Sequence, residues 1–464
     1  MRSLLSLLLL PALATAAEPQ LAVGFGETDV SPILGKKPVY MAGFGMNRQA
    51  KKLHDPIMAR AVVLSDGTKK IALVSVDVVG LFLPTIESIR GQLKGFDYVC
   101  VSSTHNHEGP DTLGLWGPNP FSSGVDPDYM KAVEAGVVKA VTAADKAKQP
   151  AVAKIGTALG GDLINDNRLP VVKHEELVAI RFDPVNSDKP AKPLGVLIQW
   201  NSHPETLAEK NAELSADFVG YAVKHVSDKY QCPAAYFTGT VGGLMTSLKV
   251  TIKNDRGDEL KDGTFEKTDA YGVAVGKLAD KALSAAVAVS LVPFDIRTKA
   301  VLVPVENGLY RLAKQVGVLN RDMYAWAGDP SPKEWTKIDD ASKPVGIKTE
   351  VGFVKLGDLE IAAIPGEIYP ELVLGKVQTP ADPGADFPEA PTEPAIYEGM
   401  KGKHKMLIGL ANDELGYFIP KRQWDEKPPY CYGLKKSQYG EVNSCGPDAA
   451  KVVCDAFRAL ATKK

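Results

Sequence analysis

Runs of consecutive apolar residues, each about one strand long, alternate along this chain with segments of helical periodicity. The clearest runs span residues 71–82 (IALVSVDVVGLF), 98–104 (YVCVSST) and 193–204 (PLGVLIQWNSHP). None shows the apolar–polar alternation of a strand with one solvent-exposed face, so each predicts a strand buried on both faces. Helical patterns follow at residues 85–93, 128–145, 216–230 and 269–289. This order predicts an α/β fold of mixed sheets flanked by helices.

The last third of the chain adds a hairpin signal to this pattern. Residues 351–367 (VGFVKLGDLEIAAIPGE) contain two apolar runs joined by Gly357-Asp358, and residues 406–413 (MLIGLAND) predict a further strand. A Gly-containing break between two such runs is typical of antiparallel strands, which is why a mixed sheet is expected. The Pro-rich stretches 329–344 and 379–394 predict surface loops.

The first residues have the pattern of a cleaved export signal. Arg2 precedes an apolar stretch that is broken by Pro11 and followed by the small residues Ala14-Thr15-Ala16-Ala17. The stretch is too short to span a bilayer, which disfavours the alternative of a membrane anchor. We therefore predict a signal peptide over residues 1–16, a single domain over 17–464, and a secreted or periplasmic protein.

Charge and cysteine content narrow the class of partner. The formal net charge is −2, with Lys and Arg spread along the chain, so a basic nucleic-acid face is not expected. Export permits disulfides, and Cys431 with Cys445 is a candidate loop staple among the three C-terminal cysteines. The five cysteines include no C-x-x-C pair, so they do not indicate a zinc site.

Polar residues that can bind a metal follow directly after apolar runs. They are His105 and His107, then His203, then Glu367, then Tyr417. Ligands bind at the carboxyl ends of strands in open α/β sheets, so these side chains can lie together at one edge of a sheet. A catalytic zinc needs about three N or O ligands and an open position for water. Taken singly, each residue also has a plain structural explanation, such as a carboxylate beside a helix start for Glu367.

The remaining histidines lack this placement, and His225 and His404 are expected to be structural or solvated.

At the strand ends, by contrast, the longer motifs become specific. They include VGFGETDVSP, LVSVDVVG, SSTHNHEGPD, NDNRLP, QWNSHPETL, IAAIPGE and GLANDELGYFIP. In order and spacing, the chain from about Gly24 to its C-terminal helix resembles the catalytic domain of the neutral/alkaline non-lysosomal ceramidases, which are secreted zinc amidases. A counterpart of the long C-terminal β-domain of that family is not expected in this chain.

The resemblance assigns roles to individual residues. It implies a zinc ion held by four side chains: His105, His203, Glu367 and Tyr417. It implies that His107 polarises or protonates the scissile amide, and that Arg168 contacts the substrate or the oxyanion. The tyrosine that stabilises the tetrahedral intermediate aligns with Tyr439, with Tyr430 and Tyr432 as alternatives.

The chain also departs from the family pattern. The serine that the family places near the metal falls on Met245, and the preceding aspartate falls on Gly243; Thr246 or Ser247 would reach the site only after a register shift. Water activated by zinc needs no serine, so that route is favoured. Two extra carboxylates, Glu108 and Glu205, are candidate general bases, with solvated or helix-start positions as the alternatives. Asp77 is a candidate to orient a ligand histidine.

These observations predict a secreted zinc-dependent hydrolase that cleaves an N-acyl amide bond through metal-activated water. The expected partners are Zn²⁺, a small-molecule or lipid N-acyl substrate, and peripheral contact with membrane lipid. Two alternatives stay open. One is a zinc hydrolase acting on another amide or an ester, and the other is a non-catalytic binding protein on a degenerate ceramidase scaffold.

Overall fold

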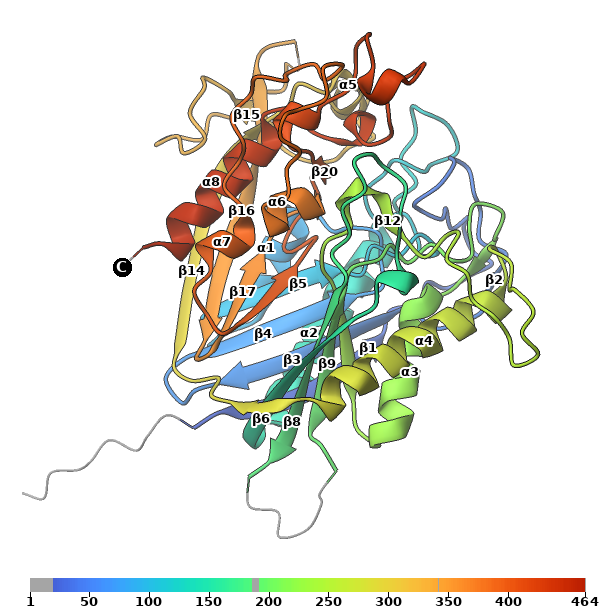
Figure 1. The fold of residues 1–464 in the computed structure, drawn as a ribbon, viewed down its shortest axis with the longest axis vertical. Coiled ribbons are helices and arrows are strands. Elements are labelled where there is room, and N and C mark those ends of the chain that lie inside the picture. Colours follow the sequence, from blue (N-terminus) through green and yellow to red (C-terminus); the bar gives the residue numbers. More distant parts are fainter. Residues whose placement is uncertain (1–19, 186–191, 341, 464) are drawn as a thin grey trace, which may run out of the picture.

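Two β-sheets stacked face to face, with helices on both outer faces, make up the computed structural model (Figure 1). The structure describes residues 20–185, 192–340 and 342–463, so the predicted signal peptide at 1–16 lies outside the described residues. The mixed α/β architecture expected from the alternation of apolar runs and helical segments is confirmed.

The first sheet has nine strands, and its order brings distant segments together. Eight of them run in the order β11 (Ala234–Thr238), β9 (Gly195–Trp200), β8 (Glu176–Pro184), β6 (Gln149–Leu159), β1 (Ala22–Asp29), β3 (Met58–Ser65), β4 (Lys70–Val76), β5 (Tyr98–Ser103). The short strand β13 (Val287–Val289) pairs with β6. The pairs β4–β5 and β9–β11 are parallel, so their carboxyl ends lie at common edges.

The second sheet has five strands and contains the predicted hairpin. Its order is β14 (Phe294–Pro304), β16 (Val345–Leu356), β17 (Leu359–Ala363), β19 (His404–Ile408), and β15 (Tyr324–Ala325) pairs with β16. Strands β16 and β17 are antiparallel across Gly357-Asp358, which confirms the hairpin, while β17 and β19 are parallel.

Burial between two layers explains why the apolar runs lack alternation. In β4, Ile71 and Leu73 belong to the core between the sheets, whereas Ala72 and Val74 face the helices α1 (Leu83–Gln92) and α2 (Pro127–Lys146). Since both faces are covered, every position of the strand favours an apolar side chain.

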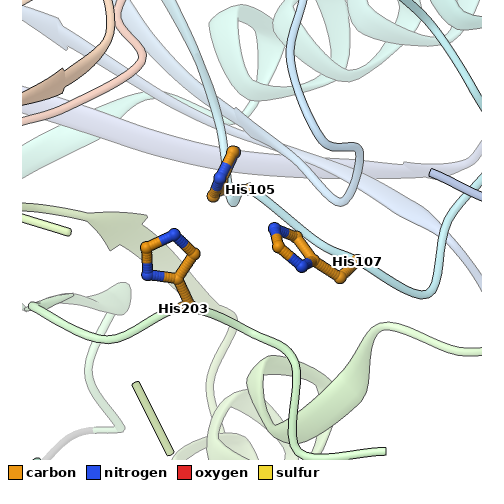
Figure 2. A group of neighbouring side chains, drawn as sticks. All are labelled: His105, His107 and His203. Atoms are coloured by element: carbon orange, nitrogen blue, oxygen red, sulfur yellow. The ribbon is translucent and has the colours of Figure 1, made fainter. Parts of the chain in front are cut away.

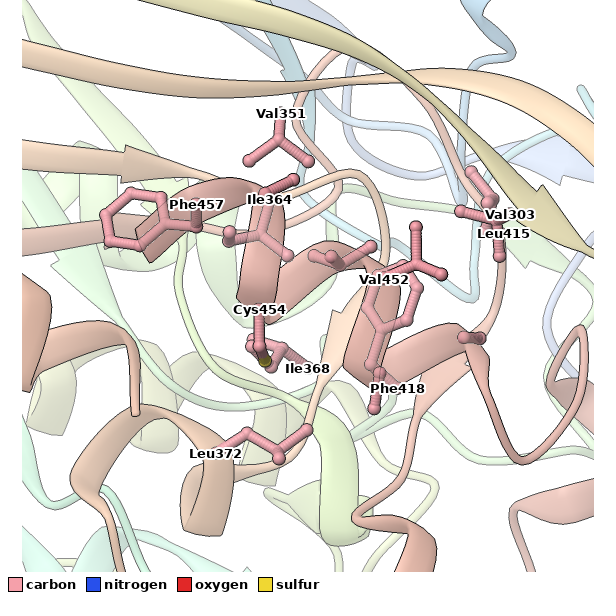
Figure 3. Packing of buried hydrophobic residues seen from close by; sticks show 14 of the residues in the cluster. Val303, Val351, Ile364, Ile368, Leu372, Leu415, Phe418, Val452, Cys454 and Phe457 are labelled. Atoms are coloured by element: carbon pink, nitrogen blue, oxygen red, sulfur yellow. The ribbon is translucent and has the colours of Figure 1, made fainter. Parts of the chain in front are cut away.

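Helices complete the outer layers. The other half of the first sheet is covered by α3 (Asp217–Tyr230) and α4 (Phe265–Ser284). The outer face of the second sheet packs against α6 (Pro370–Leu374), α7 (Ile396–Gly399) and α8 (Ala449–Ala461). Figure 3 shows this packing, with Phe457 of α8 and Val351 of β16 among the buried side chains.

Short elements connect these layers around the candidate site. The helix α5 (Gly308–Gln315) lies outside the main layers. Six two-residue strands form three pairs: β2 (Lys52–Leu53) with β10 (Glu213–Leu214), β7 (Asn165–Asp166) with β12 (Met245–Thr246), and β18 (Glu367–Ile368) with β20 (Tyr417–Phe418). Single 3₁₀ turns occupy Gly161–Leu163, Gly242–Leu244, Lys421–Gln423, Cys431–Gly433 and Glu441–Asn443. Within the described residues, every helix is too short or too polar to traverse a bilayer.

Two sequence expectations are wrong. The helix predicted over 269–289 ends at Ser284, because Val287–Val289 instead pairs with Ala153–Ile155 of β6, and the two valines favour a strand. The Cys431–Cys445 staple does not form, since all five cysteines are unpaired and buried. Cys445 instead belongs to the apolar core of the second sheet, where its thiol lies 3.4 Å from the carbonyl oxygen of Leu415.

Candidate metal centre

The four side chains predicted to bind zinc converge at one buried point. The Oε2 atom of Glu367 lies 3.2 Å from His105 Nε2 and 3.0 Å from His203 Nε2. The Tyr417 hydroxyl oxygen lies 3.4 Å from the same His203 nitrogen. Ligands about 2.0–2.1 Å from a tetrahedral zinc lie about 3.4 Å from one another, so these separations suit a shared metal ion.

The second nitrogen of each ligand histidine is held by the backbone. His105 Nδ1 donates to the carbonyl oxygen of Val79, and His203 Nδ1 donates to that of Met245, both at 2.7 Å. Because a carbonyl can only accept, each ring proton resides on Nδ1 and each Nε2 presents a lone pair. Those lone pairs face a carboxylate oxygen, an arrangement that repels unless a cation or proton lies between the atoms. The donor set therefore fits a metal ion such as zinc.

Local backbone conformation aims these residues. His105 has a φ of +65°, a left-handed value that costs free energy for a side chain with a Cβ. It follows β5 directly and is buried. Glu367 and Tyr417 are paired residues in the parallel strands β18 and β20, so their side chains project side by side. Four segments that are remote in the sequence thus supply the four side chains.

The electrostatics of the cluster favour an ionised carboxylate. Burial alone would raise the pKa of Glu367, but the neighbouring His105 and His203 hold it well below its usual range. Burial likewise acts to lower the pKa of His203, and the hydrogen-bonding contact with Glu367 raises it overall. A negative oxygen between two imidazoles is the charge arrangement that a divalent cation stabilises.

His107 completes a group of three buried histidines whose ligand-capable atoms all lie within 4.8 Å of one another, which could hold a metal ion. Figure 2 shows the rings of His105, His107 and His203 pointing toward a common centre. The ring of His107 lies 4.9 Å from that of His105 and 5.4 Å from that of His203, and its Nδ1 lies 3.4 Å from Glu205 Oε2.

The His107–Glu205 pair has a defined charge state. Burial lowers the pKa of His107 to about 4, which outweighs the contact with Glu205. Burial would raise the pKa of Glu205, but the contact with His107 and the charge of His203 lower it to about 2. Near neutral pH the pair is therefore a neutral imidazole beside an ionised carboxylate.

The other two carboxylates singled out in the sequence serve other partners. Glu108 accepts from Arg48 Nη1 at 3.1 Å and from Asn211 Nδ2 at 2.8 Å, so it is held by an ion pair and is not solvated. Asp77 accepts from Arg60 at 2.7 Å and does not orient a ligand histidine, so that expectation is wrong. Backbone carbonyls fill this role, and a carbonyl leaves no residue-type signal in the sequence.

Tyr439 lines the cavity, whereas Arg168 lies behind the cavity wall. The ring of Tyr439 is 5.9 Å from that of Tyr417 and lines the cavity, whereas Tyr430 and Tyr432 do not line it. Arg168 forms a two-pronged ion pair with Glu441 at 2.6 and 2.9 Å and donates to the carbonyl oxygen of Tyr439 at 2.7 Å. The structure thus places Arg168 behind the cavity wall, where it holds the segment that carries Tyr439.

The segment aligned with the family serine presents no hydroxyl to the cavity. The Met245 side chain is buried in the core under α3 and α4, and its backbone carbonyl supports His203. Thr246 Oγ1 accepts from the amide of Leu248, and Ser247 Oγ lies 2.7 Å from Thr206 Oγ1. None of these three residues lines the cavity.

The candidate metal-binding cluster forms one end of a cavity of about 480 Å³, a volume typical of ligand pockets. His105, His107, Glu367 and Tyr417 contribute its polar end. The remaining walls are mainly apolar and include Phe44, Val79, Phe82, Leu113, Trp116 and Leu319. The arrangement suits a molecule with one polar reacting group and a long apolar portion.

Solved ceramidases share this fold. The neutral ceramidase from Pseudomonas aeruginosa superimposes with a TM-score of 0.70 at 16% identity, covering 96% of this chain and 74% of that chain. A ceramidase complexed with C2 gives a TM-score of 0.69 at 15% identity, covering 96% and 75% of the two chains. No protein-family model matches the sequence. The fold is therefore ceramidase-like, as the motifs predicted.

Proposed function

We propose that this protein is a zinc-dependent hydrolase that cleaves N-acyl amide bonds with water as the nucleophile. The observation that carries the proposal is the position of Glu367 Oε2 between two imidazole nitrogens whose rings are fixed by backbone carbonyls. His105, His203, Glu367 and Tyr417 would hold the zinc. A bound zinc ion lowers the pKa of water to about 7 and polarises a carbonyl group.

The His107–Glu205 pair is suited to proton transfer. The carboxylate of Glu205 lies beside Nδ1 and favours the tautomer that carries its proton there. The opposite nitrogen is then free to accept a proton from the attacking water and to return it to the leaving amine. Since His107 lines the cavity, it can contact the substrate directly, which supports the role expected from the motif.

Tyr439 is suited to stabilise the developing oxyanion. Although the residue is half exposed, partial desolvation, followed by the charge of Glu367, raises its pKa to about 12, so the hydroxyl remains protonated. Asn443 Nδ2 donates to the phenolic oxygen at 2.5 Å, which leaves the phenolic proton available to the substrate. Arg168 contributes by anchoring the Tyr439 backbone rather than by direct contact.

The cavity supports a substrate with an apolar acyl portion. Its walls bury such a chain while the polar end receives the carbonyl. The absence of a hydroxyl at Met245 favours direct attack by water over a covalent serine route. An ester or a different amide would fit the same walls, and an assay with both bond types separates them.

Export through the predicted signal peptide is part of this proposal.

One experiment tests the metal and the reaction together. Zinc content is measured in the wild type, in His203→Ala, and in the control His54→Ala, whose ring stacks on Phe265 away from the cavity. Fluorescent N-acyl amides and the matching esters are assayed in parallel. We expect about one zinc per chain in the wild type and in the control, and loss of zinc and of at least about 10³-fold of the activity in His203→Ala.

Two outcomes would contradict the proposal. Full zinc retention in His203→Ala would place the metal elsewhere. Stoichiometric zinc in the wild type with no turnover of any amide or ester would favour a binding protein on this scaffold, the alternative that Met245 motivates.

A further inference from the structure

Large apolar side chains are exposed around the mouth of the catalytic cavity. Five residues, here called the rim, both line the cavity and are each 46% to 58% exposed: Met46, Leu309, Leu312, Tyr439 and Val442. They come from three segments far apart in the sequence, so their convergence is a property of the tertiary structure. Contiguous exposed apolar surface of this kind marks an interaction site.

The helix α5 is the main part of the rim. Leu309, Leu312 and Val316 lie on one helical face, at spacings of three and four residues, and none of the eight residues of the helix is buried. Asn307 caps the helix by accepting from the amides of Leu309 and Tyr310 at 2.9 and 3.2 Å. The helix is thus formed locally and keeps its apolar face uncovered, as in helices that lie in a membrane interface.

Charge around α5 favours an anionic surface. Arg311 and Lys314 are in the helix, and Arg311 donates to the backbone carbonyl of Lys343 at 2.6 Å, which brings a third cation close. Asp340 is near Arg311 and Lys343 and offsets one of these charges. Basic side chains beside an apolar helical face are attracted to anionic lipid headgroups. In a symmetric dimer, the same cations would face each other and repel.

We propose that the rim docks onto an anionic lipid aggregate, a bilayer or a micelle, and that amphiphilic substrate passes from it directly into the cavity. The inference rests on the proposed function for the identity of the cavity as the catalytic one. Leu309 and Leu312 belong to both the docking face and the cavity wall, so a lipid chain can move from one to the other without exposure to water.

Vesicle sedimentation tests the docking surface without requiring turnover. The wild type is mixed with phosphatidylcholine vesicles that contain none or about 30% phosphatidylserine. The rim variant is Leu309→Gln/Leu312→Gln. The matched control is Val152→Gln/Val287→Gln, two valines that are 49% and 55% exposed on β6 and β13 and do not line the cavity. Lys314→Gln tests the contribution of charge.

We expect the wild type and the valine control to bind anionic vesicles, and the rim variant to bind roughly tenfold more weakly because it buries less apolar area. Lys314→Gln should weaken binding to anionic vesicles several-fold and leave binding to neutral vesicles unchanged. Equal binding of the rim variant and the wild type would overturn the proposal, and so would absence of binding to either vesicle. A concentration-dependent dimer that the rim variant abolishes would show that the rim is a protein interface instead.

A water-soluble, short-chain N-acyl substrate separates this inference from the proposed function. Hydrolysis of that substrate without vesicle binding would overturn docking alone. Rim-dependent vesicle binding by a protein that hydrolyses neither amides nor esters would support docking and overturn the proposed function.

Discussion

The two ends of the cavity are built in contrasting ways. At the end proposed to bind the metal, the rings of His105 and His203 are each fixed by a backbone carbonyl, and Glu367 and Tyr417 are paired strand residues. At the mouth, the rim side chains are about half exposed, and none of the residues of α5 is itself buried. Chemistry demands positions accurate to fractions of an ångström, whereas contact with an apolar phase demands only uncovered area.

The largest effect on turnover is expected from the carboxylate of Glu205 beside His107. Glu205→Gln removes the carboxylate that favours the proton on Nδ1, so we expect the turnover number to fall about 10²-fold. Zinc content should stay unchanged, because Glu205 is not among the proposed ligands. Steady-state kinetics combined with metal analysis measures both quantities. Glu108→Gln is not a suitable control, because it would break the buried ion pair between Glu108 and Arg48. Unaltered turnover would remove Glu205 from the mechanism.

A smaller effect is expected from the glycine packed on His107. Gly43 has a φ of +95°, and a Cβ at this position would lie 2.3 Å from the His107 ring. Gly43→Ala should therefore lower the free energy of unfolding by about 1–3 kcal/mol and reduce activity through displacement of the ring. Gly45→Ala is the matched control, because a Cβ there meets no atom within 4 Å. Urea unfolding should distinguish the two, and equal stability would show that the ring moves without cost.

A third variant probes the buried polar layer beside Arg168. Burial, with repulsion from Asp166, raises the pKa of Glu371 to about 8, well above the ordinary glutamate value of 4.5. Between these two values the folded protein holds a proton that the unfolded chain releases, so this group contributes stability at low pH that is lost as the pH rises toward 8.

Glu371→Gln should consequently flatten the fall in stability between about pH 5 and pH 8. Urea unfolding of both proteins at several pH values measures the slope. Parallel curves for the wild type and the variant would show that Glu371 is ionised in the folded protein.

The smallest effect on stability should come from the rim. Leu309→Gln/Leu312→Gln should change the free energy of unfolding by no more than about 0.5 kcal/mol, since both side chains are exposed. Leu372→Ala, which empties a buried position in the core under α8, should cost about 2–5 kcal/mol. If the two leucine variants unfolded at the same denaturant concentration, the contrast between the buried core and the exposed mouth of the cavity would fail.

Some features were accessible from residue order because their cause is local. A run such as residues 71–74 is apolar at every position because both faces of β4 are covered, and histidines after β5 and β9 indicate a site at strand ends. The α/β fold and the positions of the candidate ligands follow from these patterns. The pairing of Val287–Val289 with β6 did not, because its hydrogen-bonding partner lies more than 130 residues earlier in the chain.

The sequence by itself determined most of the strand and helix pattern, the ceramidase-like fold and the choice of residues that we propose as zinc ligands. Only the tertiary structure decided how they are used. It assigned the support of the histidine rings to the carbonyls of Val79 and Met245, placed Glu205 rather than Glu108 beside the site, and kept Cys431 and Cys445 apart. These choices depend on backbone atoms and on distances between remote segments, and neither is encoded in the type of any single residue.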